Sequence, residues 1–214
     1  MSENCNLGLE LEYFFKMLII GDSGVGKTSL CKRFTYGDFS ADYVTTTSVD
    51  FKIRLVEINE KLCQLQVWDF SNDDRFKSYV SRFYRIAHGV MICFDITNEE
   101  SFLNVDNWLQ EVIKLCPEQI PVFLVGTKFD LESERTISYT TIKAYADKHQ
   151  LPYMETSSKT NENTEIYLAH FTRALVSHVD QIIIKRENKV TGGPTVILNN
   201  ETEPVQKEGS KCTI

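Results

Sequence analysis

The sequence lacks any hydrophobic run near the roughly 20 residues that a helix needs to cross a lipid bilayer. It also lacks an excess of basic residues, since its formal net charge is -7 at pH 7, which argues against a general nucleic-acid-binding protein. The first six residues are polar and acidic, so no signal peptide is visible. From these absences we expect a soluble, cytoplasmic protein that does not bind nucleic acid.

The six cysteines, at positions 5, 31, 63, 93, 116 and 212, include no pair at metal-ligand spacing. Cys63 and Cys93 lie in apolar stretches, where reduced core residues are expected. A reducing compartment such as the cytosol fits this usage. The length of 214 residues and the 42% hydrophobic content are typical of one globular domain with appendages.

Apolar stretches alternate with amphipathic ones, which predicts an α/β fold. Asn59 and Glu60 separate two strand-like stretches and favour an antiparallel hairpin. Ser101 is expected to be the N-cap of a helix. We predict a six-stranded mixed, mostly parallel sheet flanked by about five helices. The strands are expected at 13–20, 49–58, 62–68, 89–95, 121–126 and 152–155, and the helices at 27–35, 75–86, 101–115, 138–149 and 162–184.

The chain is expected to contain three parts. They are an N-terminal extension over 1–11, a main domain over 12–185 and a flexible tail over 186–214. The tail is polar, and Thr191-Gly192-Gly193-Pro194 would break a helix.

The segment Gly21–Thr28 reads GDSGVGKT and matches the phosphate-binding loop pattern G-x-x-x-x-G-K-[ST]. An apolar strand-like run precedes it and a helix-compatible run follows it. This order aims backbone N–H groups and a helix N-terminus at one anion. Lys27 would then reach the β- and γ-phosphates, and the Thr28 hydroxyl would hold Mg²⁺. The predicted phosphate-binding residues are Ser23, Gly24, Val25, Gly26, Lys27, Thr28 and Ser29.

Three further motifs follow predicted strands. Asp69 stands where a carboxylate would meet Mg²⁺ through water. Asp130, in the segment that begins with Thr127 and Lys128, can accept hydrogen bonds from N1–H and the 2-amino group of guanine, a donor pair that adenine lacks. Ser157, Ser158 and Lys159 can bring a backbone N–H to guanine O6. Each motif alone is weak, because a strand-terminal aspartate is often only a helix N-cap. The four motifs in this order predict a guanine-nucleotide site.

With these motifs the chain resembles a small GTPase of the Ras superfamily over about residues 12–184, and its Rab branch in particular. The matching segments include Ser48-Val49-Asp50-Phe51-Lys52, Leu65-Gln66-Val67-Trp68-Asp69, Asp74-Arg75-Phe76, Phe83-Tyr84-Arg85 and Phe94-Asp95-Ile96-Thr97. The resemblance implies the G domain of a P-loop NTPase. It also implies a molecular switch that binds GTP and GDP with Mg²⁺, hydrolyses GTP and acts in vesicle trafficking.

The resemblance also implies roles for single positions. Phe39 would stack on guanine, and Tyr43 would cover the phosphates. Thr46 would bring its hydroxyl to Mg²⁺ and its N–H to the γ-phosphate. Residues 37–51 and 69–84 would be the two switch segments, through which effectors, an exchange factor and a GTPase-activating protein bind. We expect a monomer.

The second switch departs from the family pattern Trp-Asp-Thr-Ala-Gly-Gln-Glu, because residues 68–74 read Trp-Asp-Phe-Ser-Asn-Asp-Asp. Asn72 stands in place of a glycine whose N–H meets the γ-phosphate, and Asp73 in place of the glutamine that orients the attacking water. We favour impaired intrinsic hydrolysis. The alternative is that Asp73 points into solvent and hydrolysis proceeds at the ordinary slow rate. The expected catalytic residues are Lys27, Thr46, Asn72 and Asp73.

The chain ends Lys211-Cys212-Thr213-Ile214, with the cysteine third from the end, whereas a C-a-a-X box needs it fourth. The sequence does not decide whether Cys212 carries a prenyl group or is unmodified. One lipid without a polybasic patch gives only reversible membrane contact. We therefore expect a cytoplasmic protein with, at most, reversible binding to the cytosolic face of an intracellular membrane. Two rivals remain: a scaffold that holds nucleotide without cycling, and another P-loop enzyme such as a small-molecule kinase, against which Asp130 counts.

Overall fold

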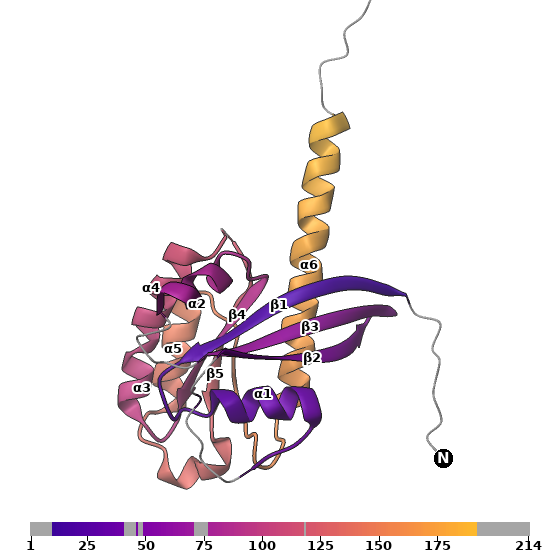
Figure 1. Ribbon diagram of the computed structural model, residues 1–214. Helices are drawn as coiled ribbons and strands as arrows, with labels where there is room; N and C mark the ends of the chain where they lie inside the picture. The colour runs from indigo at the N-terminus through magenta and orange to yellow at the C-terminus, as the bar shows by residue number, and fades with distance from the viewer. Residues whose placement is uncertain (1–9, 41–45, 47–48, 71–76, 118, 192–214) are drawn as a thin grey trace, which may run out of the picture. The chain divides into compact units, whose positions relative to one another are not determined.

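The computed structural model describes residues 10–40, 46, 49–70, 77–117 and 119–191. Their strands form one six-stranded sheet with the order β2-β3-β1-β4-β5-β6 (Figure 1). Only the β2–β3 pair is antiparallel, as predicted. The strands are β1 (Leu11–Gly21), β2 (Val49–Ile58), β3 (Lys61–Phe70), β4 (Gly89–Asp95), β5 (Val122–Thr127) and β6 (Tyr153–Glu155).

The hairpin between β2 and β3 turns at Asn59 and Glu60. Both residues have positive φ, 51° and 64°, and Ile58 pairs with Lys61. Positive φ at both central residues is the geometry of a type I′ turn, whose twist suits two-residue hairpins. The two-residue gap in the apolar pattern therefore marked the turn correctly.

Helices cover both faces of the sheet. On one face α1 and α6 pack against odd-numbered β1 residues such as Phe15, Met17 and Ile19. On the other face α2, α3, α4 and α5 pack against residues such as Leu18 and Ile20. The helices are α1 (Lys27–Tyr36), α2 (Lys77–Tyr84), α3 (Glu99–Leu103), α4 (Val105–Leu115), α5 (Tyr139–Lys148) and α6 (Thr164–Thr191), with a 3₁₀ helix at Phe129–Glu134.

The predicted helix 101–115 was wrong in its start and in its continuity. It is two helices, α3 and α4, which meet at Asn104, so six α-helices lie in the described part of the chain instead of about five. The N-cap of α3 is Asn98, whose side chain accepts a hydrogen bond from the Ser101 N–H at 3.3 Å. Ser101 instead lies inside α3 and is buried. Its hydroxyl accepts the Asp95 N–H at 3.0 Å and donates to the Asn98 carbonyl at 2.7 Å.

The last helix ends later than predicted. α6 continues to Thr191, so residues 186–191 of the predicted flexible tail are helical. Lys, Arg and Glu are good helix formers and extend a helix without an apolar stripe, which explains why the end was placed too early. The chain divides into two compact units, Met1–Asp180 and Gln181–Ile214. None of the described helices is both long enough and apolar enough to span a bilayer.

The sheet gathers the predicted site motifs at one edge. β1, β3, β4, β5 and β6 run parallel to one another, so their carboxyl ends lie on the same side of the sheet. Ligands of open α/β sheets bind outside such carboxyl ends. Gly21, Asp69, Asp95, Thr127 and Glu155 are the last or nearly the last residues of these five strands.

Candidate guanine-nucleotide site

The loop between β1 and α1 depends on two glycines. At Gly21, φ is 137° and a Cβ atom would lie 2.1 Å from the Cys93 carbonyl oxygen, so only glycine fits there. Gly26, with φ 96°, is the N-cap of α1, and its carbonyl accepts the Leu30 N–H at 2.9 Å. The loop thus passes directly into the first turn of a helix, as the motif predicted. Ser23 and Gly24 are exposed at its tip, and Val25 is buried.

Lys27 lies along the inside of this loop. Its side chain is buried, and Nζ donates hydrogen bonds to the carbonyls of Gly21 at 2.8 Å and Asp22 at 2.6 Å. These contacts hold the ammonium group beside the N-terminus of α1. A cation at that position is suited to bind phosphate oxygens, together with the backbone N–H groups of the loop.

Three oxygen-bearing side chains meet next to Lys27. The Thr28 Oγ1 donates to Asp69 Oδ2 at 2.5 Å and lies 2.7 Å from the Thr46 Oγ1. Asp69 is 2% exposed, and its second oxygen, Oδ1, has no hydrogen-bond partner. Burial raises the pKa of the Asp69 carboxyl, and the hydrogen bond from Thr28 opposes this rise.

These groups fit a magnesium ion. Mg²⁺ prefers hard oxygen ligands and usually keeps several waters, so two hydroxyls and one nearby carboxylate suffice when phosphates supply the rest. A buried carboxylate oxygen without a partner is costly, which the charge of an ion would relieve. Among the described residues no group of three or more His, Cys, Asp or Glu side chains forms an alternative metal centre.

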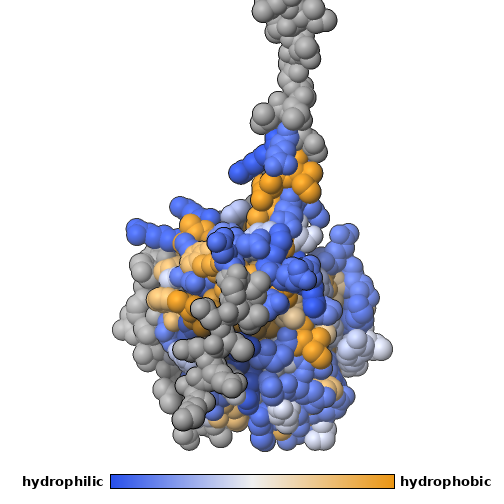
Figure 2. Space-filling view, turned by 90° about the vertical axis from the view of Figure 1, so that its right-hand side faces the viewer, coloured by the Kyte–Doolittle hydropathy of each residue, from blue (hydrophilic) through white to orange (hydrophobic). Residues whose placement is uncertain are grey.

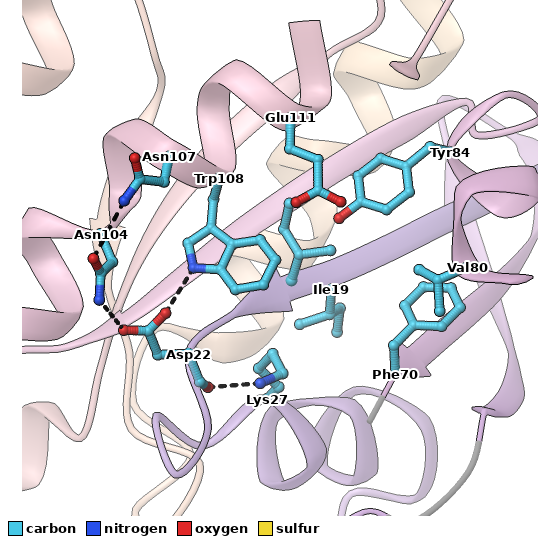
Figure 3. Close-up of a pocket in the computed structure, with 11 residues that line it drawn as sticks. Ile19, Asp22, Lys27, Phe70, Val80, Tyr84, Asn104, Asn107, Trp108 and Glu111 are labelled. Carbon is cyan, nitrogen blue, oxygen red and sulfur yellow. Dashed lines mark hydrogen bonds between the residues drawn. The ribbon is translucent and has the colours of Figure 1, made fainter. Parts of the chain in front are cut away.

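Asp22, the second residue of the loop, is held from the other side by α4 (Figure 3). Trp108 Nε1 donates to Asp22 Oδ1 at 2.8 Å, and Asn104 Nδ2 donates to Asp22 Oδ2 at 2.7 Å. Both carboxylate oxygens are therefore fixed. Trp108 and Asn104 were not among the predicted site residues, because nothing in their local sequence indicates a contact with the loop. They line a cavity of about 240 Å³ that Lys27 also borders.

At the opposite end of the site, Asp130 meets the segment after β6. The Ser157 Oγ donates to Asp130 Oδ1 at 2.6 Å, and Lys159 Nζ lies 3.8 Å from Asp130 Oδ2. The Thr160 N–H in turn donates to the Ser157 Oγ at 3.0 Å. The structure thus brings together the residues predicted to read guanine, which are far apart in the sequence.

Thr127 and Lys128 connect this end to the phosphate loop. The buried Thr127 hydroxyl lies 2.5 Å from the Val25 carbonyl and 2.9 Å from the Phe94 carbonyl. Lys128 has a positive φ of 60°, and its Nζ lies 2.6 Å from Asp95 Oδ2. With the ammonium group held by Asp95, the aliphatic stem of Lys128 is available to a flat base.

A largely buried ion pair between Arg135 and Glu155 lies next to the segment that follows β6. Arg135 donates through Nη1 and Nη2 to both oxygens of Glu155, at 2.9 and 2.5 Å, and Tyr153 Oη donates to Glu155 Oε1. The bond to Glu155 raises the pKa of the Arg135 guanidinium. Glu155 ends β6 and directly precedes the Ser157 segment, so this bidentate pair fixes where that segment starts. No local pattern around Arg135 predicts this contact.

The structure describes some of the remaining predicted site residues, and others lie outside the described ranges. Phe39 follows α1, is half-buried, and its N–H donates to Asp38 Oδ1 at 2.7 Å. Ser29 lies in the first turn of α1, while Ser158 is half-buried and Lys159 exposed beyond β6. Tyr43, Asn72, Asp73 and Cys212 lie outside the described residues.

Comparisons with known proteins agree with this geometry. The Ras family model matches residues 16–177. The chain is also 47% identical over 156 residues to Ras-related protein RABD2a from Arabidopsis thaliana, covering 73% of this chain and 77% of the relative. A loop that can hold phosphates, a site that fits Mg²⁺ and a carboxylate able to read guanine are the parts such a protein needs. The chain belongs to the Ras superfamily of small GTPases and is of the Rab type.

Proposed function

We propose that this chain is a GTP- and GDP-binding switch that hydrolyses GTP slowly and regulates vesicle trafficking. One observation carries the proposal: the phosphate loop, the Thr28–Thr46–Asp69 group and the Asp130–Ser157 pair lie along the same edge of one sheet. Calorimetry in magnesium buffer would test nucleotide binding. Tight binding of GDP and GTP with weak binding of ATP is expected, and no binding of either guanine nucleotide would refute the proposal.

In this proposal Thr28 and Thr46 hold Mg²⁺ through their hydroxyls, and Asp69 holds it through water. Bound Mg²⁺ would neutralise charge on the β- and γ-phosphate oxygens. Lys27 binds the same oxygens from the loop side. Asp130 accepts the two N–H groups of guanine, while Ser157 and Lys159 fix the carboxylate that does so. The side chains of Phe39 and Lys128 flank the base, and the loop residues Ser23 to Ser29 enclose the phosphates.

Slow hydrolysis follows from the composition of the second switch. In the family pattern, the position of Asp73 holds a glutamine close to the γ-phosphate, so an aspartate there would replace an amide donor with an anion beside a highly charged group. At an effective dielectric constant near 20, two like charges roughly 5 Å apart repel by about 3 kcal/mol. A barrier raised by that amount slows a reaction about a hundredfold. Single-turnover GTP cleavage by the parent chain and by Asp73→Gln tests this, with faster cleavage expected for the variant and equal rates contradicting it. Asn72 would keep the N–H that meets the γ-phosphate.

Partner binding through 37–51 and 69–84 has support in one aromatic cluster. Phe51 at the end of the first segment stacks on Trp68 with ring centroids 4.9 Å apart, and Phe83 of the second segment lies 4.5 Å from Trp68. Phe51, Ile53 and Leu55 alternate along β2 and are 48%, 49% and 54% exposed. In Figure 2 the visible surface is mostly hydrophilic, with apolar residues gathered in patches. An exposed apolar stripe beside two switch segments suits an effector, an exchange factor or a GTPase-activating protein.

The proposed trafficking role is supported by the Rab type of the chain alone. We place the protein in the cytoplasm, as a monomer with reversible contact to the cytosolic face of an intracellular membrane through a prenyl group on Cys212. Intact mass of protein from its native cell tests the lipid. A mass increase that Cys212→Ser abolishes is expected, and an unshifted mass would remove the membrane part of the proposal.

A scaffold that holds GTP without cycling is the second candidate, because Asp73 and Asn72 both depart from the hydrolytic pattern. The nucleotide bound to freshly isolated protein distinguishes the two. GDP, or a mixture that an exchange factor converts to GTP, supports the switch. GTP that neither exchanges nor is cleaved supports the scaffold.

A further inference from the structure

One arginine binds three main-chain carbonyls in two segments of the chain. Arg33 lies in the last turn of α1 and is half-buried. Its Nε donates to the Ser158 carbonyl at 2.7 Å, Nη2 to the Lys159 carbonyl at 3.2 Å and Nη1 to the Gly37 carbonyl at 2.6 Å. All three nitrogen atoms of the guanidinium group thus contact a main-chain oxygen.

These three carbonyls belong to two segments that bear residues predicted to contact guanine, and we call this part the base end of the site. Ser158 and Lys159 continue from Ser157, whose hydroxyl holds Asp130. Lys159 also places its ammonium group 3.8 Å from Asp130. The main chain of this segment is therefore fixed by Arg33, while its side chains contact the carboxylate proposed to read guanine.

Gly37 begins the second of these two segments. It is the C-cap of α1 with a φ of 67°, and its N–H donates to the Arg33 carbonyl at 3.1 Å. Both the N–H and the C=O of Gly37 are thus bonded to Arg33, two residues before Phe39. The start of the first switch segment is therefore tied to the same side chain that holds the Ser158 segment.

We infer that Arg33 is a positioning residue that clamps the base end of the nucleotide site and limits nucleotide release. The inference rests on the proposed function, which it deepens. A guanidinium group has five N–H donors in a rigid plane, so it fixes the directions of three acceptors at once, which a lysine ammonium on a flexible stem does not. Loss of the clamp frees the Ser158 segment and the Gly37 segment together.

The test compares release of ribose-labelled fluorescent GDP from the parent chain, Arg33→Ala and Arg33→Lys. Arg173→Ala, which removes an exposed arginine from α6, is the matched control. Because hydrogen bonds from a charged donor are the stronger class, we expect about tenfold faster release from Arg33→Ala. Arg33→Lys should also release GDP faster than the parent, and Arg173→Ala at the parent rate. If Arg33→Ala does not fold, Arg33→Lys is the test variant, because it keeps the charge and most of the aliphatic stem.

Two readouts separate a clamp at the base end from general loosening. Chelation of Mg²⁺ weakens only the phosphate end, so the acceleration caused by the Arg33 variants should keep the same factor with and without EDTA. Single-turnover GTP cleavage should stay at the parent rate. Release at the parent rate, an acceleration that disappears in EDTA, or an equal loss of cleavage would each overturn the inference. Failure of the parent chain itself to bind GDP would instead refute the proposed function.

Discussion

Trp108 and Asp22 are 86 residues apart, yet the indole Nε1 donates to the Asp22 carboxylate at 2.8 Å. Because Asn104 holds the other oxygen, α4 fixes the second residue of the phosphate loop from outside. Trp108→Phe keeps the aromatic packing and removes this donor. We expect the loosened loop to release GDP about tenfold faster, since the lost bond is to a charged group. Stopped-flow release rates measure the effect, with Ile113→Ala on the exposed side of α4 as control; equal rates for Trp108→Phe and the parent would contradict it.

Thr28→Val removes a hydroxyl at nearly constant shape. If that hydroxyl holds Mg²⁺, the variant loses most of the magnesium dependence of GDP binding, a change of at least about tenfold. The ratio of GDP affinities in Mg²⁺ and in EDTA measures this dependence. Thr28→Ser retains the hydroxyl and should behave as the parent does. A Thr28→Val protein with the full parental ratio would show that the hydroxyl does not hold the ion.

Asp130→Asn replaces one acceptor oxygen with an amide donor. Guanine presents two donors to this side chain, so one of them would face another donor and affinity for GDP should fall about a hundredfold or more. Xanthosine diphosphate carries a carbonyl where guanine has its amino group and should bind the variant better than GDP does. Titration of both nucleotides against parent and variant decides the matter. Unchanged preference for GDP would mean that Asp130 does not read the base.

His88 predicts a dependence of stability on pH. Its Nδ1 accepts the Lys16 N–H at 2.9 Å, and burial, assisted by the nearby charges of Lys16 and His178, lowers the pKa of the imidazole below its usual 6.5. The folded state therefore resists protonation more than the unfolded chain does. As pH falls below about 6.5 the unfolded chain binds a proton first, so the free energy of unfolding decreases.

The variant His88→Asn tests this dependence. It offers an amide oxygen near the position of Nδ1 and does not titrate. Urea unfolding between pH 7.5 and 5.5 should give a shallower loss of stability for the variant than for the parent. His178→Asn, at the neighbouring histidine, shows how much of the effect depends on the second charge. Identical slopes for parent and His88→Asn would exclude the His88 contribution.

The parts of the fold that were predicted correctly depend on local patterns. The phosphate loop needs particular residues at fixed spacing, and the hairpin at Asn59 and Glu60 needs two residues between apolar strands. Parallel pairing then placed Asp69, Asp130 and Ser157 at one edge, as expected. Their roles toward a nucleotide stay predictions.

The parts that were missed depend on contacts between distant residues. The start of α3 was missed because Asn98, three residues before the expected N-cap Ser101, makes the cap. Three contacts that support the site also have no local sign in the sequence, because they exist only after the helices have packed on the sheet. They are Arg33 with Ser158, Arg135 with Glu155, and Trp108 with Asp22. The helices and strands could be predicted from local patterns, but these long-range contacts that hold the site residues could not.

The chain has two tryptophans, and both contact segments that are predicted to respond to the nucleotide. Trp108 is bonded to the phosphate loop, and Trp68 lies between Phe51 and Phe83 of the two switch segments. The tryptophan fluorescence of the unlabelled protein should therefore change when nucleotide binds or is released. Trp108→Phe and Trp68→Phe would separate the two signals, giving one optical reporter for the phosphate loop and another for the surface proposed to bind partners.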